Sequence, residues 1–335
     1  MLPLAITMGC PGGIGPEIIL KLFTHSHDNH QSPAIIVGDK NVLEFYAKKL
    51  QIECSIVSWS PGDTVPAENN VIPVFETSVL SAGSIQPGKF CKETAIAMAD
   101  AIISAVRGVQ ESYFSGICTC PISKEALQKS GHHFPGHTEM LAELTSSSNH
   151  VMMLAGTSLR VTLATIHCGI AQVPGLLNQK SLLKLYRTTY NSLLIDFAIP
   201  EPRIAVAALN PHAGENGMFG NEEEEIIIPS MEKAREESII LHGPFPPDTV
   251  FLQASRGDFD AVICMYHDQG LIPLKLLHFK DGVNITIGLP IVRTSVDHGT
   301  AYDIAGKGVA DTASLAAAVD LANTIIQNRN ISGGA

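Results

Sequence analysis

The sequence predicts an α/β fold in which short buried strands alternate with helices around a mostly parallel sheet. One observation is the start of the chain, where an apolar run at residues 2–7 leads through a glycine-rich loop into a helical pattern beginning near Glu17. Another is the recurrence of short apolar runs separated by longer amphipathic stretches. At 335 residues the chain exceeds the size at which one hydrophobic core usually keeps growing, so two domains are expected.

The individual elements follow from the spacing of apolar residues. A short apolar run bounded by glycine, proline or polar residues suits a strand buried on both faces, whereas apolar residues three and four positions apart suit a helix. We therefore expect strands at residues 2–7, 34–37, 116–120, 161–166, 204–209 and 261–266, helices at 40–50, 92–109 and 121–130, and a loop at 60–70. The acidic run at 222–225 is expected to cap a helix and to face water.

The composition is that of a compact globular protein, with 45% hydrophobic and 16% charged residues. The net charge of −11 and the lack of a lysine or arginine block disfavour nucleic acid and anionic membranes as partners, because both need clustered cations. Seven cysteines without a repeating spacing indicate reduced thiols rather than a disulfide framework. The N-terminus has no basic region and glycines break its apolar run, so we expect a cytoplasmic protein without a signal peptide.

The glycine-rich loop at residues 9–16 has two interpretations. It could cradle a phosphate, or it could form a tight turn between a strand and a helix. It lacks the third glycine of the dinucleotide fingerprint and the Lys-Ser/Thr of a P-loop, which favours the turn. Pro16 and Glu17 suit the first turn of the helix that follows. Backbone N–H groups in this turn have no acceptor within the helix, so the N–H that proline lacks costs no hydrogen bond, and a carboxylate complements the helix dipole.

Three of the predicted strands are each followed by a histidine, namely His167, His212 and His267. The carboxyl ends of parallel strands lie at one edge of a sheet, where ligands gather. Three imidazoles delivered there can converge on one divalent cation and leave positions open for substrate and water. A structural role is the better interpretation of any one of these histidines alone, but their shared position favours a metal site.

A second group of polar residues suits an anionic substrate. His137 and Thr138 follow a Pro-Gly turn at a predicted helix start, where side chains and backbone N–H groups can face an anion, although Thr138 could also be a simple N-cap. Lys275, Asn284 and Arg293 offer a point charge, an amide and a bidentate fork for a phosphate or carboxylate. Ordinary surface positions are the alternative for these three residues.

Seven motifs carry a resemblance to a known family. In chain order they are MGCPGGIGPEI, FPGHTE, LNPHAGE, PPDTVF, MYHDQG, DGVNIT and GLPIVRTSVDHGTA. Together they resemble the 4-hydroxythreonine-4-phosphate dehydrogenase family of pyridoxal phosphate biosynthesis, which includes paralogues acting on four-carbon acid phosphates. The resemblance implies a fold similar to isocitrate and isopropylmalate dehydrogenases, not Rossmann, with a cleft between two α/β domains. The first domain would comprise residues 1–127 and 299–335 on the cofactor side, and the second, residues 128–298, would carry the metal site, the substrate site and the dimer contacts.

The resemblance also implies roles for particular residues. The metal ligands would be His167, His212 and His267, with zinc, magnesium or cobalt as the ion, and the substrate-binding residues would be His137, Thr138, Asp248, Lys275, Asn284 and Arg293. Asp248 could instead cap a helix. Family members are homodimers whose active site is completed by the neighbouring subunit, so the three histidines could come from two chains.

The same resemblance places a cofactor segment at residues 298–308, HGTAYDIAGKG. It is similar to the adenosine-binding loop of isopropylmalate-type dehydrogenases, in which an aspartate holds the ribose hydroxyls. Asp303 matches that aspartate, and His298, Gly299 and Thr300 precede it. An acidic residue there favours NAD, while NADP stays open and a plain turn before the last helix is the alternative.

The chain departs from the family pattern in its first motif. An acidic residue is usual at position 10 and alanine at position 12, whereas this chain has Cys10 and Gly12. The positions that match the family's metal and substrate residues are all intact.

The expected reaction is the NAD(P)-dependent, divalent-metal-dependent oxidation of 4-phosphohydroxy-L-threonine to 2-amino-3-oxo-4-phosphooxybutanoate. This product decarboxylates to 3-amino-2-oxopropyl phosphate in pyridoxine 5'-phosphate biosynthesis. His137, Lys275 or a metal-bound water could accept the proton. The motifs also fit oxidation of D-threonate or D-erythronate 4-phosphate. Rival functions are a metal-dependent phosphohydrolase and a binding protein that senses a phosphorylated metabolite.

Overall fold

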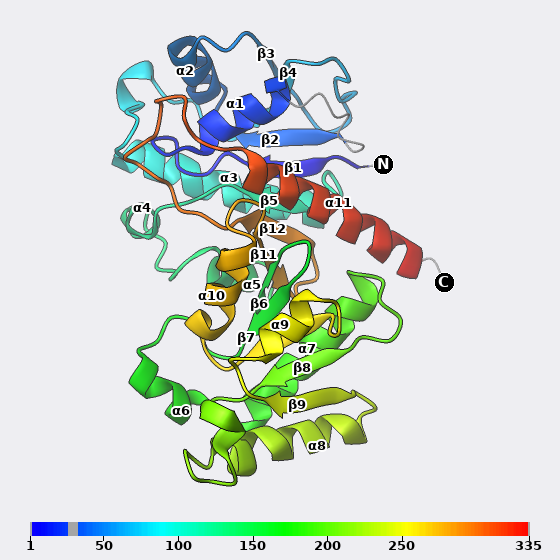
Figure 1. The fold of residues 1–335 in the computed structure, drawn as a ribbon. Helices are drawn as coiled ribbons and strands as arrows, with labels where there is room; N and C mark the ends of the chain where they lie inside the picture. The colour runs from blue at the N-terminus through cyan, green and yellow to red at the C-terminus, as the bar shows by residue number, and fades with distance from the viewer. Residues whose placement is uncertain (1, 26–32, 334–335) are drawn as a thin grey trace. The chain divides into compact units, whose positions relative to one another are not determined.

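The computed structural model describes residues 2–25 and 33–333 of the chain (Figure 1). The protein divides into two compact units, Met1–Ser148 with Leu289–Ile326 and Asn149–Gly288 with Gln327–Ala335. Both units combine a sheet with covering helices, which confirms the predicted α/β class. The stretches 128–148 and 289–298, assigned to the second domain from the sequence, pack with the first unit. None of the helices in the described ranges is both long and apolar enough to cross a membrane.

Among the described residues, the first unit holds six strands in the order β3-β4-β2-β1-β5-β12. Their bounds are β1 Leu4–Thr7, β2 Ala34–Gly38, β3 Ser55–Ser58, β4 Val71–Glu76, β5 Ile117–Thr119 and β12 Arg293–Val296. Each pairing between neighbours is parallel. The central strand β1 is buried over its whole length, as expected of a strand covered on both faces.

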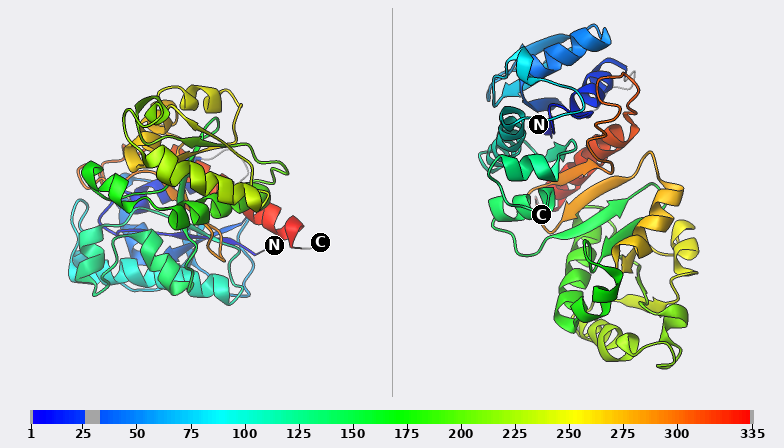
Figure 2. Two further views of the ribbon diagram at one scale, coloured as in Figure 1. Left: turned by 90° about the horizontal axis from the view of Figure 1, so that it is seen from below. Right: turned by 90° about the vertical axis from the view of Figure 1, so that its left-hand side faces the viewer.

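Helices cover both faces of this first sheet (Figure 2). α3 (Lys92–Gln110) packs on one face against β1 and β2, while α1 (Gly15–His25) and α11 (Ala313–Ser332) lie on the other. Predicted apolar positions of α3, including Ala95, Ala99 and Ile102, are buried in the core. The other helices of this unit, among the described residues, are α2 Lys40–Leu50, η1 Ala82–Ser84, α4 Lys124–Lys129 and α5 His137–Leu144.

The second unit holds, among its described residues, six strands in the order β11-β6-β7-β10-β8-β9. β6 runs antiparallel to both β7 and β11, and the other pairings are parallel. The strands are β6 Val151–Ala155, β7 Arg160–Leu163, β8 Ile204–Ala207, β9 Leu241–Phe245, β10 Ala261–Cys264 and β11 Val283–Ile287. The helices are η2 Ile170–Gln172, α6 Val173–Leu176, α7 Gln179–Ile195, η3 Pro211–Gly214, η4 Glu223–Ile227, α8 Ile228–Glu236, α9 Val250–Ser255 and α10 His267–Leu277.

The acidic run at 222–225 differs from the expectation. Glu223, the first residue of η4, is only 2% exposed. Its carboxylate accepts the backbone N–H groups of Leu209 and Asn210 at 2.8 and 2.9 Å, beyond the end of β8. The expectation that the whole run faces water is therefore wrong for Glu223. The backbone N–H groups that follow the buried strand β8 need an acceptor, and the Glu223 carboxylate is that acceptor.

The glycine-rich loop is a tight turn in which the glycines let main-chain atoms of other residues approach closely. A Cβ at Gly12 would lie 1.7 Å from the carbonyl oxygen of Lys89, and one at Gly15 would lie 2.2 Å from that of Met8. Main-chain atoms thus occupy the space that side chains would need. This packing supports the turn interpretation over a phosphate cradle.

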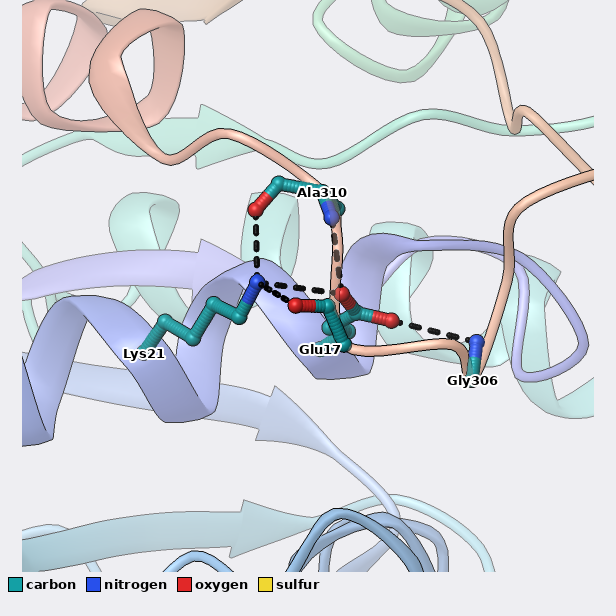
Figure 3. A network of polar contacts seen from close by, with 5 residues as sticks. Glu17, Lys21, Gly306 and Ala310 are labelled. Carbon is teal, nitrogen blue, oxygen red and sulfur yellow. Dashed lines mark hydrogen bonds and ion pairs between the residues drawn. The ribbon is translucent and has the colours of Figure 1, made fainter.

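Glu17, in the first turn of α1, connects this helix to a loop almost three hundred residues later (Figure 3). Its buried carboxylate accepts the N–H groups of Gly306 and Ala310 at 3.1 and 2.9 Å. Lys21 lies 3.2 Å from the same carboxylate and donates to the carbonyls of Gly308 and Ala310. The pair therefore fixes residues 306–310 against α1.

Replacing Glu17 by alanine should lower the free energy of unfolding by about 2–4 kcal/mol, because two backbone donors lose a charged acceptor. The matched control is Glu44→Ala, whose Lys40 partner is 4.0 Å away at an exposed site, and this change should cost less than about 1 kcal/mol. Urea denaturation of both variants measures the difference. Equal losses in the two variants would contradict the role assigned to Glu17.

Candidate active site

The three predicted metal ligands follow three neighbouring strands of the second unit. His167 comes after β7, His267 after β10 and His212 after β8. Because β10 pairs in parallel with both β7 and β8, all three residues leave the sheet at the same edge. The order of the strands therefore explains how residues far apart in the sequence approach one another.

His167 and His267 lie together beside a cavity of about 310 Å³, which is also lined by Cys168, Tyr266 and Asp268. The two ring centroids are 6.0 Å apart. Asp268 Oδ1 is 2.7 Å from His267 Nδ1, so Nδ1–H donates to the carboxylate and the lone pair of Nε2 is left for a cation. With Zn–N distances of about 2.0–2.1 Å, two imidazoles at a tetrahedral angle on one ion have centroids roughly 5 Å apart, so this pair is about 1 Å wider than two ligands of one cation.

His212 does not line this cavity. It lies in η3 with a left-handed φ of 54°, followed by Ala213 at 55°, and its ring centroid is 6.0 Å from that of Phe219. Within residues 2–25 and 33–333, no group of three histidine, cysteine, aspartate or glutamate side chains is placed to hold a metal ion. The role of His212 as the third ligand stays a prediction.

In the first unit, His137 and Thr138 begin α5, and Arg293 begins β12 beside β5. The N-cap of α5 is Gly136, which has an extended backbone and makes no side-chain cap. The alternative in which Thr138 is the N-cap is therefore wrong, because Thr138 already lies in the first helical turn.

Arg293 is a buried cation. Its side chain is 3% exposed, and Nη2 donates to Thr119 Oγ1 at 2.9 Å. Burial lowers the pKa of Arg293 to about 10, although the nearby Cys118 and Glu139 oppose this shift. The guanidinium is still protonated at neutral pH and is suited to bind an anionic group.

His137 lies near this cation with its Nε2 atom buried. Nε2 makes no hydrogen bond to any residue that the structure describes. Burial, and then the charge of Arg293, hold the pKa of His137 well below the usual value of about 6.5. The imidazole is therefore neutral at neutral pH, with a buried ring nitrogen that a ligand could satisfy.

The remaining predicted substrate residues belong to the second unit. Lys275 is half-buried in the last turn of α10. Asn284, in β11, has a buried Oδ1 without a hydrogen-bond partner in the described part of the chain. Asp248 is exposed in the turn before α9, whose N-cap is Thr249.

The predicted cofactor segment follows β12 in the first unit. Gly306 and Gly308 have φ values of 69° and 74°, the left-handed region that favours glycine. Gly299 has no such requirement, and a Cβ there would meet nothing within 4 Å among the described residues. Asp303 is exposed, and the Thr300 carbonyl accepts the N–H of Ile14 at 3.0 Å.

Three residues around these sites received no role from the sequence. Thr119 and Glu139 lie beside Arg293, and Asp268 orients His267. Two of them could have been suspected, since Glu139 follows the His-Thr pair and Asp268 follows His267 in the chain. Thr119 gave no signal, because its contact with Arg293 joins positions far apart in the sequence.

The comparisons with known proteins agree on one family. A protein of Desulfosudis oleivorans named 4-hydroxythreonine-4-phosphate dehydrogenase is 48% identical over 326 residues, 95% of this chain and 94% of the relative. A protein of Oceanobacillus iheyensis, provisionally named D-threonate 4-phosphate dehydrogenase, is 43% identical over 93% of this chain and 94% of the relative. The crystal structure of 4-hydroxythreonine-4-phosphate dehydrogenase from Klebsiella pneumoniae has a TM-score of 0.90 at 40% identity, covering 97% of this chain and 98% of that one.

Residues 30–322 match the family model described as pyridoxal phosphate biosynthetic protein PdxA. The match spans most of the chain, and the relatives above are similar over nearly their whole length. The chain therefore belongs to the PdxA family of pyridoxal phosphate biosynthetic proteins.

Proposed function

We propose that the chain oxidises 4-phosphohydroxy-L-threonine to 2-amino-3-oxo-4-phosphooxybutanoate with NAD or NADP as the hydride acceptor. The observation that carries this proposal is the likeness, at 46% and 48% identity, to proteins named 4-hydroxythreonine-4-phosphate dehydrogenase. D-threonate 4-phosphate is the second candidate substrate, because the relative at 43% identity is named for it. Both are phosphorylated four-carbon hydroxy acids.

The donor set fits a divalent metal. His167 and His267 would hold the ion, with His212 of the same chain or of a second copy as the third ligand. A bound divalent cation supplies Lewis-acid chemistry, which lowers the pKa of a coordinated hydroxyl. The hydrogen bond that His267 Nδ1–H donates to Asp268 supports this role, because it fixes the tautomer that leaves Nε2 able to coordinate. Imidazole ligands suit zinc and cobalt, and magnesium is the further candidate.

The substrate's anionic groups would be bound by Arg293, Lys275 and Asn284, with His137 and Thr138 as further hydrogen-bonding groups and Asp248 at the periphery. Oxidation transfers a hydride from the carbinol carbon to the nicotinamide and the hydroxyl proton to a base. A neutral His137 can accept that proton, and Lys275 is the alternative. The 3-oxo acid that results loses carbon dioxide, since its ketone accepts the electrons of the breaking bond.

The nicotinamide cofactor would bind along residues 298–303. Asp303 is exposed and would bind the ribose hydroxyls, while a 2'-phosphate would be repelled by the same carboxylate, so NAD is favoured over NADP. Gly299 offers open space at which a ligand can approach the backbone. His298 and Thr300 flank that position.

A homodimer is also part of the proposal. The outer side of α10 and the loop after it expose Ile272, Leu276 and Phe279 at 67%, 83% and 81%. Such apolar exposure is typical of an interface. His267 and Lys275 lie on the same helix, so a second copy seated there would approach the proposed metal and substrate residues.

The direct test mixes purified protein, NAD, a divalent cation and 4-phosphohydroxy-L-threonine and follows absorbance of the reduced nicotinamide. We expect turnover that falls at least roughly 100-fold after chelation with EDTA and returns on adding zinc, cobalt or magnesium. D-threonate 4-phosphate, run in parallel, identifies the preferred substrate. Release of inorganic phosphate without reduced nicotinamide would indicate a phosphohydrolase instead, and ligand binding without turnover would indicate a sensor.

Light scattering of the same preparation should give about twice the chain mass of 35.8 kDa.

Replacing Gly299 by alanine separates ligand binding from folding. Because a Cβ meets no described atom within 4 Å, the melting temperature should stay within about 2 °C of the wild type, whereas the KM for NAD should rise roughly tenfold if the cofactor approaches this backbone. Gly83→Ala is the matched control, since Gly83 is equally open and lies outside the segment. An unchanged KM in both variants would remove Gly299 from the cofactor site.

The ring of His137 should titrate well below pH 6.5 in a ¹⁵N-histidine NMR titration. Arg293→Met should raise that pKa towards the ordinary value, because it removes one of the two causes, whereas Arg187→Met, at an exposed ion pair, should leave it unchanged. The lowered pKa also determines how the free energy of unfolding changes with pH. His137 contributes stability that is present above its unfolded pKa and lost as the pH falls towards the folded pKa. A ring that titrates near pH 6.5 in the wild type would contradict this account.

A further inference from the structure

Tyr302 lies where three segments of the first unit meet. Its hydroxyl is 3.2 Å from Cys10 Sγ in the glycine-rich loop, and its ring stacks on Phe90 with centroids 6.4 Å apart. Its backbone carbonyl lies so close to Gly88 that a Cβ there would be 2.9 Å away. The N–H of Gly88 in turn donates to the carbonyl of Gly12 at 2.8 Å. Tyr302 is therefore held at its hydroxyl, its ring and its main chain.

The contact between Cys10 and Tyr302 is uncharged. Cys10 is fully buried, and burial raises the pKa of both its thiol and the Tyr302 hydroxyl, so both keep their protons at neutral pH. Each group can donate and accept, and the Tyr302 hydroxyl also interacts with the side chains of Ser123 and Thr300, so these neutral groups satisfy one another without burying a charge. A carboxylate at position 10 would place a charge against the same hydroxyl.

The same contact fixes the main chain beside the proposed cofactor residues. Thr300 is tied to Ile14 of the glycine-rich loop by a 3.0 Å backbone hydrogen bond, and Tyr302 is tied to Cys10 of that loop. Asp303 follows directly and is exposed. The direction in which Asp303 leaves the main chain thus depends on how firmly the residue before it is held.

We propose that Tyr302 is a positioning residue for the nicotinamide cofactor and that Cys10 holds its hydroxyl in place. The inference rests on the proposed function, because Asp303 is a ribose-binding residue only if the chain uses a nicotinamide. It adds a specific reason for Cys10 in this chain. The neutral thiol holds the Tyr302 hydroxyl without placing a charge in the buried loop.

The test compares Tyr302→Phe, Cys10→Ala, Cys10→Ser and the double variant Cys10→Ala/Tyr302→Phe in the full-length protein. Tyr113→Phe is the matched control, since it removes a tyrosine hydroxyl at an exposed position. Calorimetry gives the Kd for NAD, steady-state kinetics separate KM for NAD from kcat, and thermal melting reports folding.

We expect Tyr302→Phe and Cys10→Ala each to raise the Kd and KM for NAD roughly three- to tenfold, with kcat changed less than about twofold, because both changes remove the hydrogen bond between Cys10 and Tyr302. Tyr302→Phe should have the larger effect, since its hydroxyl also interacts with Ser123 and Thr300. The double variant should bind NAD no worse than Tyr302→Phe, since that change already removes the hydroxyl that Cys10 contacts. Cys10→Ser should restore most of the affinity, because a hydroxyl can replace the thiol as donor and acceptor. Tyr113→Phe should match the wild type.

An unchanged Kd for NAD in Tyr302→Phe would overturn the inference, and so would fully additive effects in the double variant. A fall in melting temperature with unaltered affinity in the folded fraction would assign the contact a structural role only, which also overturns it. If the wild type itself neither binds NAD nor oxidises the four-carbon acid phosphates, the proposed function fails and this inference fails with it. If the wild type does both and the variants match it, only the positioning role is lost.

Discussion

The geometry of both units depends on one constraint, which is that parallel strands end at the same edge of their sheet. In the first unit β1, β5 and β12 are neighbours, so the glycine-rich loop after β1 meets the residues after the other two strands. The N–H of Cys10 donates to Pro121 and that of Ile14 to Thr300, at 2.9 and 3.0 Å. In the second unit the same constraint brings His167 and His267 into one cavity. Loop residues far apart in the chain thereby become neighbours.

The buried charge of Arg293 explains the polar residues that surround it in the first unit. A buried guanidinium such as Arg293 is costly unless anions or hydrogen-bond acceptors surround it, and Thr119 and Glu139 provide part of that environment. His137 stays neutral beside it, so no second positive charge is buried. An anionic substrate would strengthen this arrangement. A chain with net charge −11 can thus favour a small anion locally while its surface repels polyanions.

The sequence was informative where local patterns decide the structure. Apolar runs located β1, β2, β5, β7, β8 and β10 to within a few residues, and the position after parallel strands indicated that His167 and His267 lie at one edge. It was uninformative where long-range contacts decide. The burial of Glu223 depends on backbone donors after β8, and the backbone of His212 turns left-handed in a way that no residue pattern signals. The partners of Arg293 likewise become visible only when β5 and β12 pair.

Gly12 and Cys10, both in the glycine-rich loop, belong to one packing arrangement. Alanine at position 12 would put a methyl group 1.7 Å from the Lys89 carbonyl, so Gly12 is what allows the segment before α3 to lie on the loop. That segment carries Phe90 against the ring of Tyr302, whose hydroxyl then reaches position 10. A neutral partner at position 10 suits a hydroxyl enclosed in this way, because a carboxylate would bury a charge where burial already raises the pKa of its neighbours. Gly12 therefore leaves room for the segment that carries Phe90, and Cys10 contacts the tyrosine on which Phe90 stacks.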